Sequence, residues 1–394
     1  REVVALPWKE TDAMKERENF LHEVMLREKP VKSLCQEYGI SEKTGYKWKK
    51  RFEEEGKRGL LERSRAPRDS PGRLDEDTVI NIINLRNAHP TWGPKKICAL
   101  YPKMHPKGLT PSLSSIKRVL DKARLTRKRK VRQGDADSAS RLRRHIQPEE
   151  CNDVWAIDFK GWWISDGEKC EPLTIRDLIS KKMLAVRLMQ SKDTEAVKAV
   201  MAEVFRKYGL PKVIRSDNGT PLCAPHGVLS LTRLSAWWIT LGILPDRTDK
   251  GRPGQNGSLE RVHADIAAEV EKKVPGGVAA NQAFLDSWVE EYNSVRPNEA
   301  IGMRTPDEVY RPSPRKYSGD YDAIEYPPGF LPRKVYKTGE LSVSGVRASL
   351  STALSGLTVG LRPLGGGVYE VFLADFLLGT MDFNLCCFKP LDVI

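Results

Sequence analysis

The spacing of apolar residues changes near residue 150, and this change constrains the fold more than any other feature. In residues 10–62 and again in 78–124, apolar residues recur at helical spacing. From residue 151 onwards, short apolar runs typical of strands alternate with segments of helical periodicity. A chain of 394 residues has room for several domains. We therefore expect a multidomain α+β chain, with helical domains in front of a mixed α/β domain.

The excess of basic residues lies entirely in the helical part. Residues 1–150 hold 35 Lys and Arg against 22 Asp and Glu, whereas residues 151–394 hold 30 of each. A basic module of this kind favours a polyanion such as nucleic acid, which it would bind by counterion release. A soluble basic surface without such a partner is the alternative.

Other classes of protein are disfavoured by the cysteines and by hydropathy. The seven cysteines are scattered, without Cys-x-x-Cys or paired-histidine spacing, so a disulfide framework and a structural zinc site are not expected. No apolar run approaches the roughly 20 residues that a membrane span needs. A reducing cytosol is the expected compartment.

Residues 1–63 are expected to form a first helix-turn-helix domain. A helix that ends near Pro30 precedes a short helix over 31–38, a break at Gly39, and a longer helix that Ser41 caps. The longer helix would lie in the major groove, with its first turns at base edges and its lysines at phosphates. The candidate DNA-binding residues of this helix are Ser41, Lys43, Thr44, Lys47, Lys50 and Arg51. An ordinary helical hairpin has a similar pattern, so a purely structural pair stays open for this segment taken alone.

Residues 73–125 contain further helical segments, at 78–88, 94–101 and 112–124. The last carries Lys117 and Arg118 and favours a second, winged-helix-like helix-turn-helix domain. Two such domains in tandem favour DNA, because a long site is then held twice. A basic linker follows over 126–150, and it would track the DNA backbone or minor groove without reading sequence. Its candidate residues are Arg127, Lys128, Arg129 and Lys130; a solvated linker is the alternative.

Residues 151–312 are expected to form the α/β domain. The predicted strands are 153–160, 173–177, 183–189 and 212–216, and the predicted helices are 194–208, 231–241, 258–273 and 281–292. This order indicates a mixed sheet covered on both faces. Five tryptophans are expected in its core: Trp155, Trp162, Trp163, Trp237 and Trp238. After a proline-rich connector over 313–330, short alternating runs broken by glycines predict a small β-barrel over 331–394.

Three carboxylates stand out by their context. Asp158 interrupts the apolar strand WAIDFKG, Asp217 follows a strand in IRSDNG, and Glu260 begins a helix after a glycine-rich loop in GRPGQNGSLERVH. A carboxylate in an apolar strand is costly without a cation or hydrogen-bond partners. If the fold brings the three together, their oxygens suit Mg²⁺ or Mn²⁺, and two such ions can activate a hydroxyl against a phosphodiester. Taken singly, Asp217 would more often be a turn residue and Glu260 a first-turn residue.

Several neighbours of these carboxylates are also candidates. Lys160 shares the strand face of Asp158, and Asn256 lies in the loop before Glu260. His263 follows Glu260 by three residues, hence on the same helix face. Each is a candidate DNA contact, against a surface lysine or a satisfied histidine as the alternative. Asp177 is expected to be a structural carboxylate.

Four segments together resemble a known family. WAIDFKG, VIRSDNGTP, RPGQNGSLERVH and YNSVRPNEAIGMRTPDEVY are similar to the catalytic core of DDE transposases of the retroviral-integrase superfamily. Within that group, the chain most resembles IS481/IS3-type bacterial insertion-sequence transposases. The 42 residues between Asp217 and Glu260 exceed the integrase-type spacing.

The resemblance implies both a fold and a reaction. It implies a ribonuclease-H-like core in which Asp158, Asp217 and Glu260 hold two Mg²⁺ or Mn²⁺ ions and are the catalytic residues. It implies hydrolysis at the 3′ end of a transposon, followed by attack of the freed 3′-OH on target DNA. The implied partners are the terminal inverted repeats, target DNA and further copies of the chain, in the bacterial cytoplasm at the nucleoid. A non-catalytic DNA-binding regulator and a plain nuclease are the alternatives.

Overall fold

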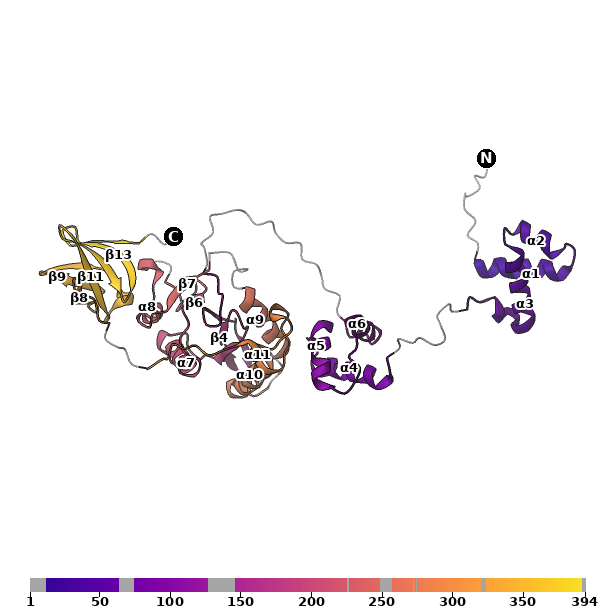
Figure 1. Ribbon diagram of the computed structural model, residues 1–394, viewed down its shortest axis with the longest axis horizontal. Helices are drawn as coiled ribbons and strands as arrows, with labels where there is room; N and C mark the ends of the chain where they lie inside the picture. Colours follow the sequence, from indigo (N-terminus) through magenta and orange to yellow (C-terminus); the bar gives the residue numbers. More distant parts are fainter. Residues whose placement is uncertain are drawn as a thin grey trace, which may run out of the picture. The chain divides into compact units, whose positions relative to one another are not determined.

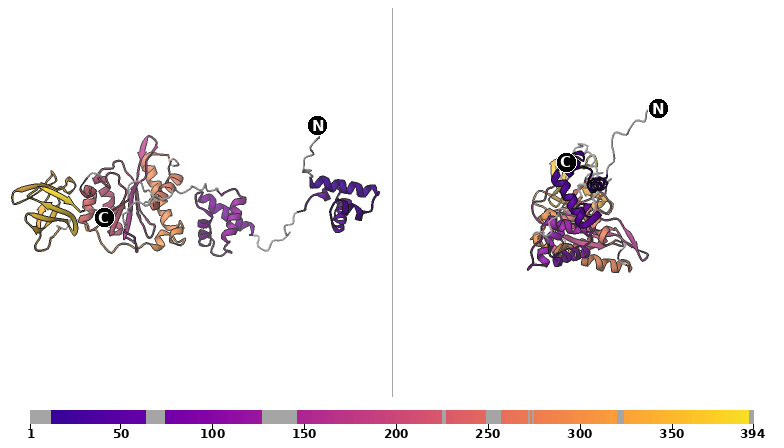
Figure 2. Two further views of the ribbon diagram at one scale, coloured as in Figure 1. Left: turned by 90° about the horizontal axis from the view of Figure 1, so that it is seen from above. Right: turned by 90° about the vertical axis from the view of Figure 1, so that its right-hand side faces the viewer.

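The computed structural model describes residues 12–63, 74–126, 146–224, 227–248, 257–271, 273, 275–319 and 324–391 (Figures 1 and 2). The chain divides into two compact units, residues 1–73 and 74–394. Each unit is described by itself below.

The first unit is helical, as its periodicity predicts. Its elements are α1 (Ala13–Leu26), α2 (Val31–Glu37), α3 (Glu42–Glu55) and a 3-10 turn (Gly56–Leu60). Ser41 caps α3 by accepting a hydrogen bond from the Thr44 amide at 3.2 Å. At Gly45 a Cβ atom would lie 2.3 Å from the Cys35 sulfur, so only glycine lets α3 approach α2 this closely.

The second unit begins with three helices, α4 (Glu76–Ala88), α5 (Pro94–Met104) and α6 (Leu113–Lys122). Ser112 caps α6, accepting from the Ser115 amide at 3.2 Å. Trp92, Ile97 and Ile116 are buried in the small core that these helices share. The three helices confirm the predicted segments.

The α/β domain is built on one mixed five-stranded sheet of order β5-β4-β1-β6-β7. Its strands are β1 (Val154–Phe159), β4 (Pro172–Asp177), β5 (Met183–Leu188), β6 (Val213–Ser216) and β7 (Leu244–Arg247). β1 pairs with β4 antiparallel and with β6 parallel. A small hairpin of β2 (Trp163–Ser165) and β3 (Glu168–Cys170) extends from it.

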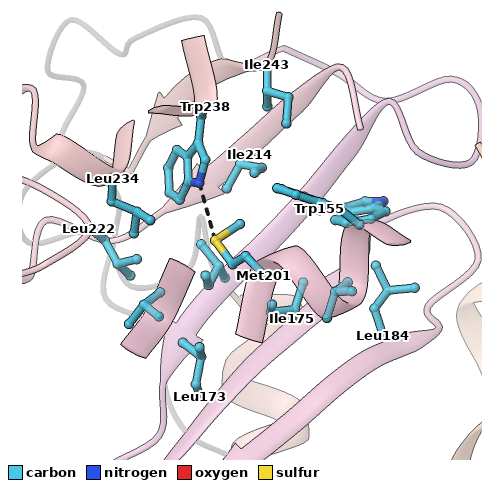
Figure 3. Close-up of a cluster of buried hydrophobic side chains, with 14 of the residues drawn as sticks. Trp155, Leu173, Ile175, Leu184, Met201, Ile214, Leu222, Leu234, Trp238 and Ile243 are labelled. Carbon is cyan, nitrogen blue, oxygen red and sulfur yellow. Dashed lines mark hydrogen bonds between the residues drawn. The ribbon is translucent and has the colours of Figure 1, made fainter. Parts of the chain in front are cut away.

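Helices cover both faces of this sheet, as expected (Figure 1). α7 (Thr194–Tyr208) and α8 (Arg233–Thr240) pack on the face that buries Trp155 and Ile157. Figure 3 shows this core, in which the Trp238 indole donates to the Met201 sulfur at 3.3 Å. α9 (Gly257–Glu269) and α10 (Gly277–Ser294) pack on the opposite face. The short helix α11 (Pro306–Val309) follows α10.

The expectation that all five tryptophans are buried is wrong for Trp162. Its side chain is 58% exposed, whereas the other four lie in the core. Trp162 precedes β2, whose first residue, Trp163, is buried; the next side chain of the strand, Ile164, is exposed. Alternation at this hairpin therefore leaves Trp162 outside, where the Lys169 ammonium lies 5.7 Å from its ring centroid.

The C-terminal part is all-β. The strands are β8 (Leu331–Lys334), β9 (Glu340–Val343), β10 (Val346–Ser349), β11 (Thr358–Gly365), β12 (Val368–Leu373), β13 (Phe376–Asp382) and β14 (Cys387–Pro390). They form an antiparallel sheet β14-β13-β12-β11-β8 and a separate β9–β10 hairpin, which lies beside both β8 and β14. Within the residues described, no hydrogen-bonded ladder joins the two sheets, so the structure shows two antiparallel sheets around one core, and the closed barrel stays a prediction. Ala236 and Ile239 of α8 belong to that core.

Membrane-spanning geometry is absent from the described helices, none of which combines the necessary length with sufficient hydropathy.

Candidate active site and DNA-binding surfaces

Asp158 lies on the sheet face that α9 covers. Side chains alternate along a strand, and the neighbours Trp155 and Ile157 enter the core under α7 and α8. Val154 and Ala156 instead pack against Leu259 of α9. Asp158 continues this second set, so the carboxylate belongs to the α9 face.

Asp217 lies at the neighbouring strand end. In the parallel ladder of β1 and β6, Ile157 is paired with Ser216. Asp158 and Asp217 each come one residue later, at matching positions of adjacent parallel strands. The chain turns sharply after Asp217, since a Cβ atom on Gly219 would lie 3.0 Å from the Asp217 Oδ2.

Glu260 lies in the first turn of α9, where its side chain is exposed. One turn later, the His263 Nε2 lies 2.9 Å from the Thr174 hydroxyl. Thr174 is the cross-strand partner of Asp158 and donates its hydroxyl hydrogen to the Asp158 carbonyl at 2.9 Å. Thr174 thus links the helix that carries Glu260 to the strand that carries Asp158.

His263 is a neutral imidazole in this position. Burial, with a smaller contribution from the Lys160 ammonium, lowers the pKa of His263 to about 4. Because the Thr174 hydrogen goes to Asp158, the Nε2 of His263 must be the donor in their contact. The structure therefore gives the predicted DNA-binding histidine a partner inside the protein.

Arg176 is a site residue that sequence reasoning missed. Its buried guanidinium donates from Nη1 to the Ser258 carbonyl at 2.6 Å and hydroxyl at 3.0 Å, and from Nη2 to the Tyr292 hydroxyl at 2.9 Å. These bonds fix the start of α9, two residues before Glu260. An arginine directly after Ile175 in the strand PLTIRD was the available sequence pattern.

Lys160 is engaged within the protein. Its ammonium binds the Glu271 carboxylate at 2.8 Å and lies 5.1 Å from the Trp163 ring centroid, with 8% of the residue exposed. Asp177 is fully buried and accepts hydrogen bonds from the Asn152 amide and from Ser180. The prediction that Asp177 is a structural carboxylate is confirmed.

The strands β1 and β6 and the helix α9, which carry or precede the predicted triad, lie next to one another. The three carboxylates do not form a metal site in this structure. Among the residues it describes, no three His, Cys, Asp or Glu side chains converge closely enough to hold an ion. Asp158, Asp217 and Glu260 are the residues here whose carboxylate oxygens could hold an ion if they came together. Oxygen donors of this kind suit Mg²⁺ or Mn²⁺ rather than a thiolate-binding metal.

The exposed face of α3 is strongly basic. Lys43, Lys47 and Lys50 are exposed at helical spacing, and Tyr46, 51% exposed, lies among them. Tyr46 was not predicted, because a tyrosine on an amphipathic helix is more often part of a core. Ser41 caps the helix by accepting a hydrogen bond from the Thr44 amide, and the hydroxyl groups of Ser41 and Thr44 lie 2.9 Å apart.

The other predicted DNA-binding residues fall into three groups. Arg51 is half-buried, with its guanidinium 5.1 Å from the Trp48 ring centroid. Lys117 and Arg118 are exposed on α6. Arg127, Lys128, Arg129, Lys130 and Asn256 lie outside the described residues.

Family models match most of the chain in pieces. An integrase core domain matches residues 148–253 and a second integrase core model matches 241–306. A helix-turn-helix domain matches residues 16–68, and a homeodomain-like domain matches 44–120. These matches define a protein with an integrase core behind DNA-binding helical domains.

One curated protein that is similar to this chain comes from an insertion element. Over 240 residues the chain is 24% identical to the insertion element IS407 uncharacterized 31.7 kDa protein of Burkholderia multivorans, covering 60% of this chain and 82% of that protein. The chain is thus similar to an insertion-element protein, and parts of it match the integrase core and helix-turn-helix models.

The solved structures that match this chain are less similar to it in sequence than the insertion-element protein is. The HTLV-2 integrase catalytic core domain in complex with magnesium, in its trimeric form, is 14% identical with a TM-score of 0.31, covering 42% of this chain and 100% of that one. The simian T-cell lymphotropic virus intasome in complex with a PP2A regulatory subunit is 12% identical with a TM-score of 0.35, covering 75% of this chain and 97% of that one.

Proposed function

We propose that the chain is a metal-dependent DNA transposase that hydrolyses the phosphodiester at the 3′ end of its element and joins the 3′-OH to target DNA. The observation that carries the proposal is the pairing of Ile157 with Ser216, which precede Asp158 and Asp217 on adjacent parallel strands. α9, which carries Glu260 in its first turn, covers the same face through Leu259.

Asp158, Asp217 and Glu260 would hold the metal in this proposal. Two divalent ions, when bound, lower the pKa of an attacking water or hydroxyl and stabilise the leaving oxygen. The chain itself then orients the three carboxylates. Arg176 holds the first turn of α9, and Thr174 and His263 hold its second turn against β1 and β4. No protein nucleophile is needed.

The helical domains would choose the DNA. α3 would enter the major groove with Lys43, Lys47 and Lys50, and α6 would make a second contact with Lys117 and Arg118. The linker residues Arg127, Lys128, Arg129 and Lys130 would contact the DNA backbone, and so would Asn256, four residues before Glu260 in the sequence. Since two ends must be joined together, the working form would be a dimer or higher assembly on DNA, in the cytoplasm at the nucleoid.

A cleavage assay tests this proposal. With a duplex that ends in the inverted repeats flanking its gene, the wild-type chain should cut only when Mg²⁺ or Mn²⁺ is present. Asp217→Asn removes one anionic ligand and should abolish cutting while end binding stays nearly intact, as measured by gel shift on the same duplex. Equal cutting by the variant would defeat the triad. Binding without any cutting by the wild type would instead favour a non-catalytic regulator.

A further inference from the structure

A polar cavity lies beside the start of α9, between α5 and the α/β domain. Its volume is about 410 Å³, and its lining includes Lys96 of α5, Arg176, Lys181, and Ser258 and Arg261 of α9. The helical and α/β parts are in contact around it: Lys103 pairs with Glu308 at 2.7 Å and His89 with Glu291 at 2.9 Å. The cavity therefore lies open to solvent between α5 and the α/β domain, within one compact unit.

Three of the four cations that line this cavity, Lys96, Lys181 and Arg176, have no carboxylate of the described residues bound to them. In the described part of the chain, the Lys96 ammonium makes no hydrogen bond or ion pair, and Lys181 donates to the Leu178 carbonyl rather than to a carboxylate. Arg176 likewise donates to the Lys181 and Ser258 carbonyls and to two hydroxyl groups. Three positive charges thus face the cavity without a carboxylate bound to any of them.

The two acidic residues of the lining do not balance this charge, because other cations already hold them. Asp265 binds Arg296 at 2.8 Å, and Arg261 reaches it only at 3.8 Å. Glu299 pairs with Lys95, which is not one of the residues that line the cavity. The cavity therefore keeps an excess of positive charge.

Burial of unpaired cations has an electrostatic cost that an anion would relieve. Desolvation is the main cause that lowers the pKa of Lys96 to about 8, with the Arg296 guanidinium adding to it. Desolvation and the neighbouring Arg176 lower the pKa of Lys181 as well. A bound anion would favour the charged form of both lysines and reverse these shifts.

We propose that this cavity binds a phosphate group through Lys96, Lys181 and Arg261, with the charge of Arg176 behind them. Lysine ammonium and arginine guanidinium groups are the usual donors to phosphate oxygens. Most N–H groups of Arg176 are used by Ser258, Tyr292 and Lys181, so it contributes charge and fixes the cavity wall. The phosphate is a phosphodiester of DNA or a free phosphate ion. Binding of a DNA phosphodiester rests on the proposed function. It would place one backbone phosphate beside Ser258, two residues before Glu260 in the sequence.

Amine labelling of the wild-type full-length chain tests the proposal. An N-hydroxysuccinimide ester reacts only with the neutral amine, and mass spectrometry of peptides gives the rate at each lysine. Labelling is compared at pH 8 in chloride, in inorganic phosphate, and with a duplex oligonucleotide, all at one ionic strength. Lys103, at the far end of α5 and paired with Glu308, is the internal control.

We expect the labelling rate of Lys96 to fall at least about fivefold, the effect at pH 8 of raising a pKa of about 8 by one unit. The rate of Lys181 should fall as well, while that of Lys103 changes little. Protection by the duplex alone identifies a DNA phosphodiester, and protection by inorganic phosphate identifies a free phosphate ion. Protection by neither probe overturns the proposal. Lysine labelling is measured independently of DNA cutting. If the chain cuts DNA but Lys96 and Lys181 are not protected from labelling, the phosphate site alone is refuted. If the two lysines are protected but the chain does not cut DNA, the proposed function alone is refuted.

Discussion

His263 shows how one side chain couples two parts of the candidate site. It lies one turn after Glu260, and its Nε2 donates to Thr174, the cross-strand partner of Asp158. Sequence reasoning proposed His263 as a DNA contact near Glu260, and that stays a prediction. The contact with Thr174 could not be predicted, because the partner comes from β4, 89 residues away in the chain.

The buried His263 predicts a pH dependence of stability. Its pKa is about 4 in the folded chain, below its ordinary value of 6.5, so the unfolded state binds the extra proton between these values. The stabilisation is complete above pH 6.5 and is lost as the pH falls toward 4. It amounts to at most about 3 kcal/mol. His263→Gln, which keeps an N–H donor, should flatten this part of the profile in urea unfolding from pH 4 to 7. An unchanged slope in the variant would assign the dependence to other groups.

At the scale of elements, α3 presents its lysines on one face, as its sequence predicts. The cap at Ser41 and the close approach at Gly45 fix where this helix begins and how it packs on α2. The Lys47 ammonium also lies 4.2 Å from the Trp48 ring centroid, which restrains an otherwise flexible side chain.

Lys47→Ala should weaken DNA binding and make it less dependent on salt. If Lys47 contacts one phosphate, the slope of log K against log salt should fall by about one. The measurement is fluorescence anisotropy of a labelled duplex over a series of salt concentrations. Lys29→Ala is the matched control, because Lys29 lies outside α3 and binds Glu37 at 2.7 Å. The same slope for Lys47→Ala and the wild type would show that this face of α3 does not meet DNA.

Elements governed by local patterns could be predicted, and those governed by distant pairing could not. The helix caps at Ser41 and Ser112 are short-range features and were placed correctly. β7 was missed because its sequence, LPDR, has little strand propensity and becomes a strand by pairing with β6 at the sheet edge. The expected helix over 258–273 ends earlier, at Glu269.

The three carboxylates of the candidate site could be proposed from the sequence, whereas the residues that support them could not. The carboxylates stood out because Asp158 interrupts an apolar strand. The anchoring of α9 by Arg176 depends on the approach of β4, α9 and α10, which no local pattern encodes. The exposure of Glu260 also follows only from the packing of α9.

At the scale of the whole chain, charge and chemistry are divided between regions. Residues 1–150 carry the excess of basic residues, whereas the carboxylates of the proposed active site lie in a neutral α/β region. The cavity lined by Lys96 and Arg261 is shared by both kinds of domain. This division agrees with front domains that bind DNA and an α/β domain that acts on it.

A structure of the full chain on its end DNA with Mn²⁺ tests the central claim most directly. Anomalous scattering locates the metal independently of any assumed ligand. The account predicts manganese about 2 Å from carboxylate oxygens of Asp158, Asp217 and Glu260, with the scissile phosphate beside it. Manganese bound elsewhere, or Glu260 remote from both aspartates on the engaged DNA, would contradict it.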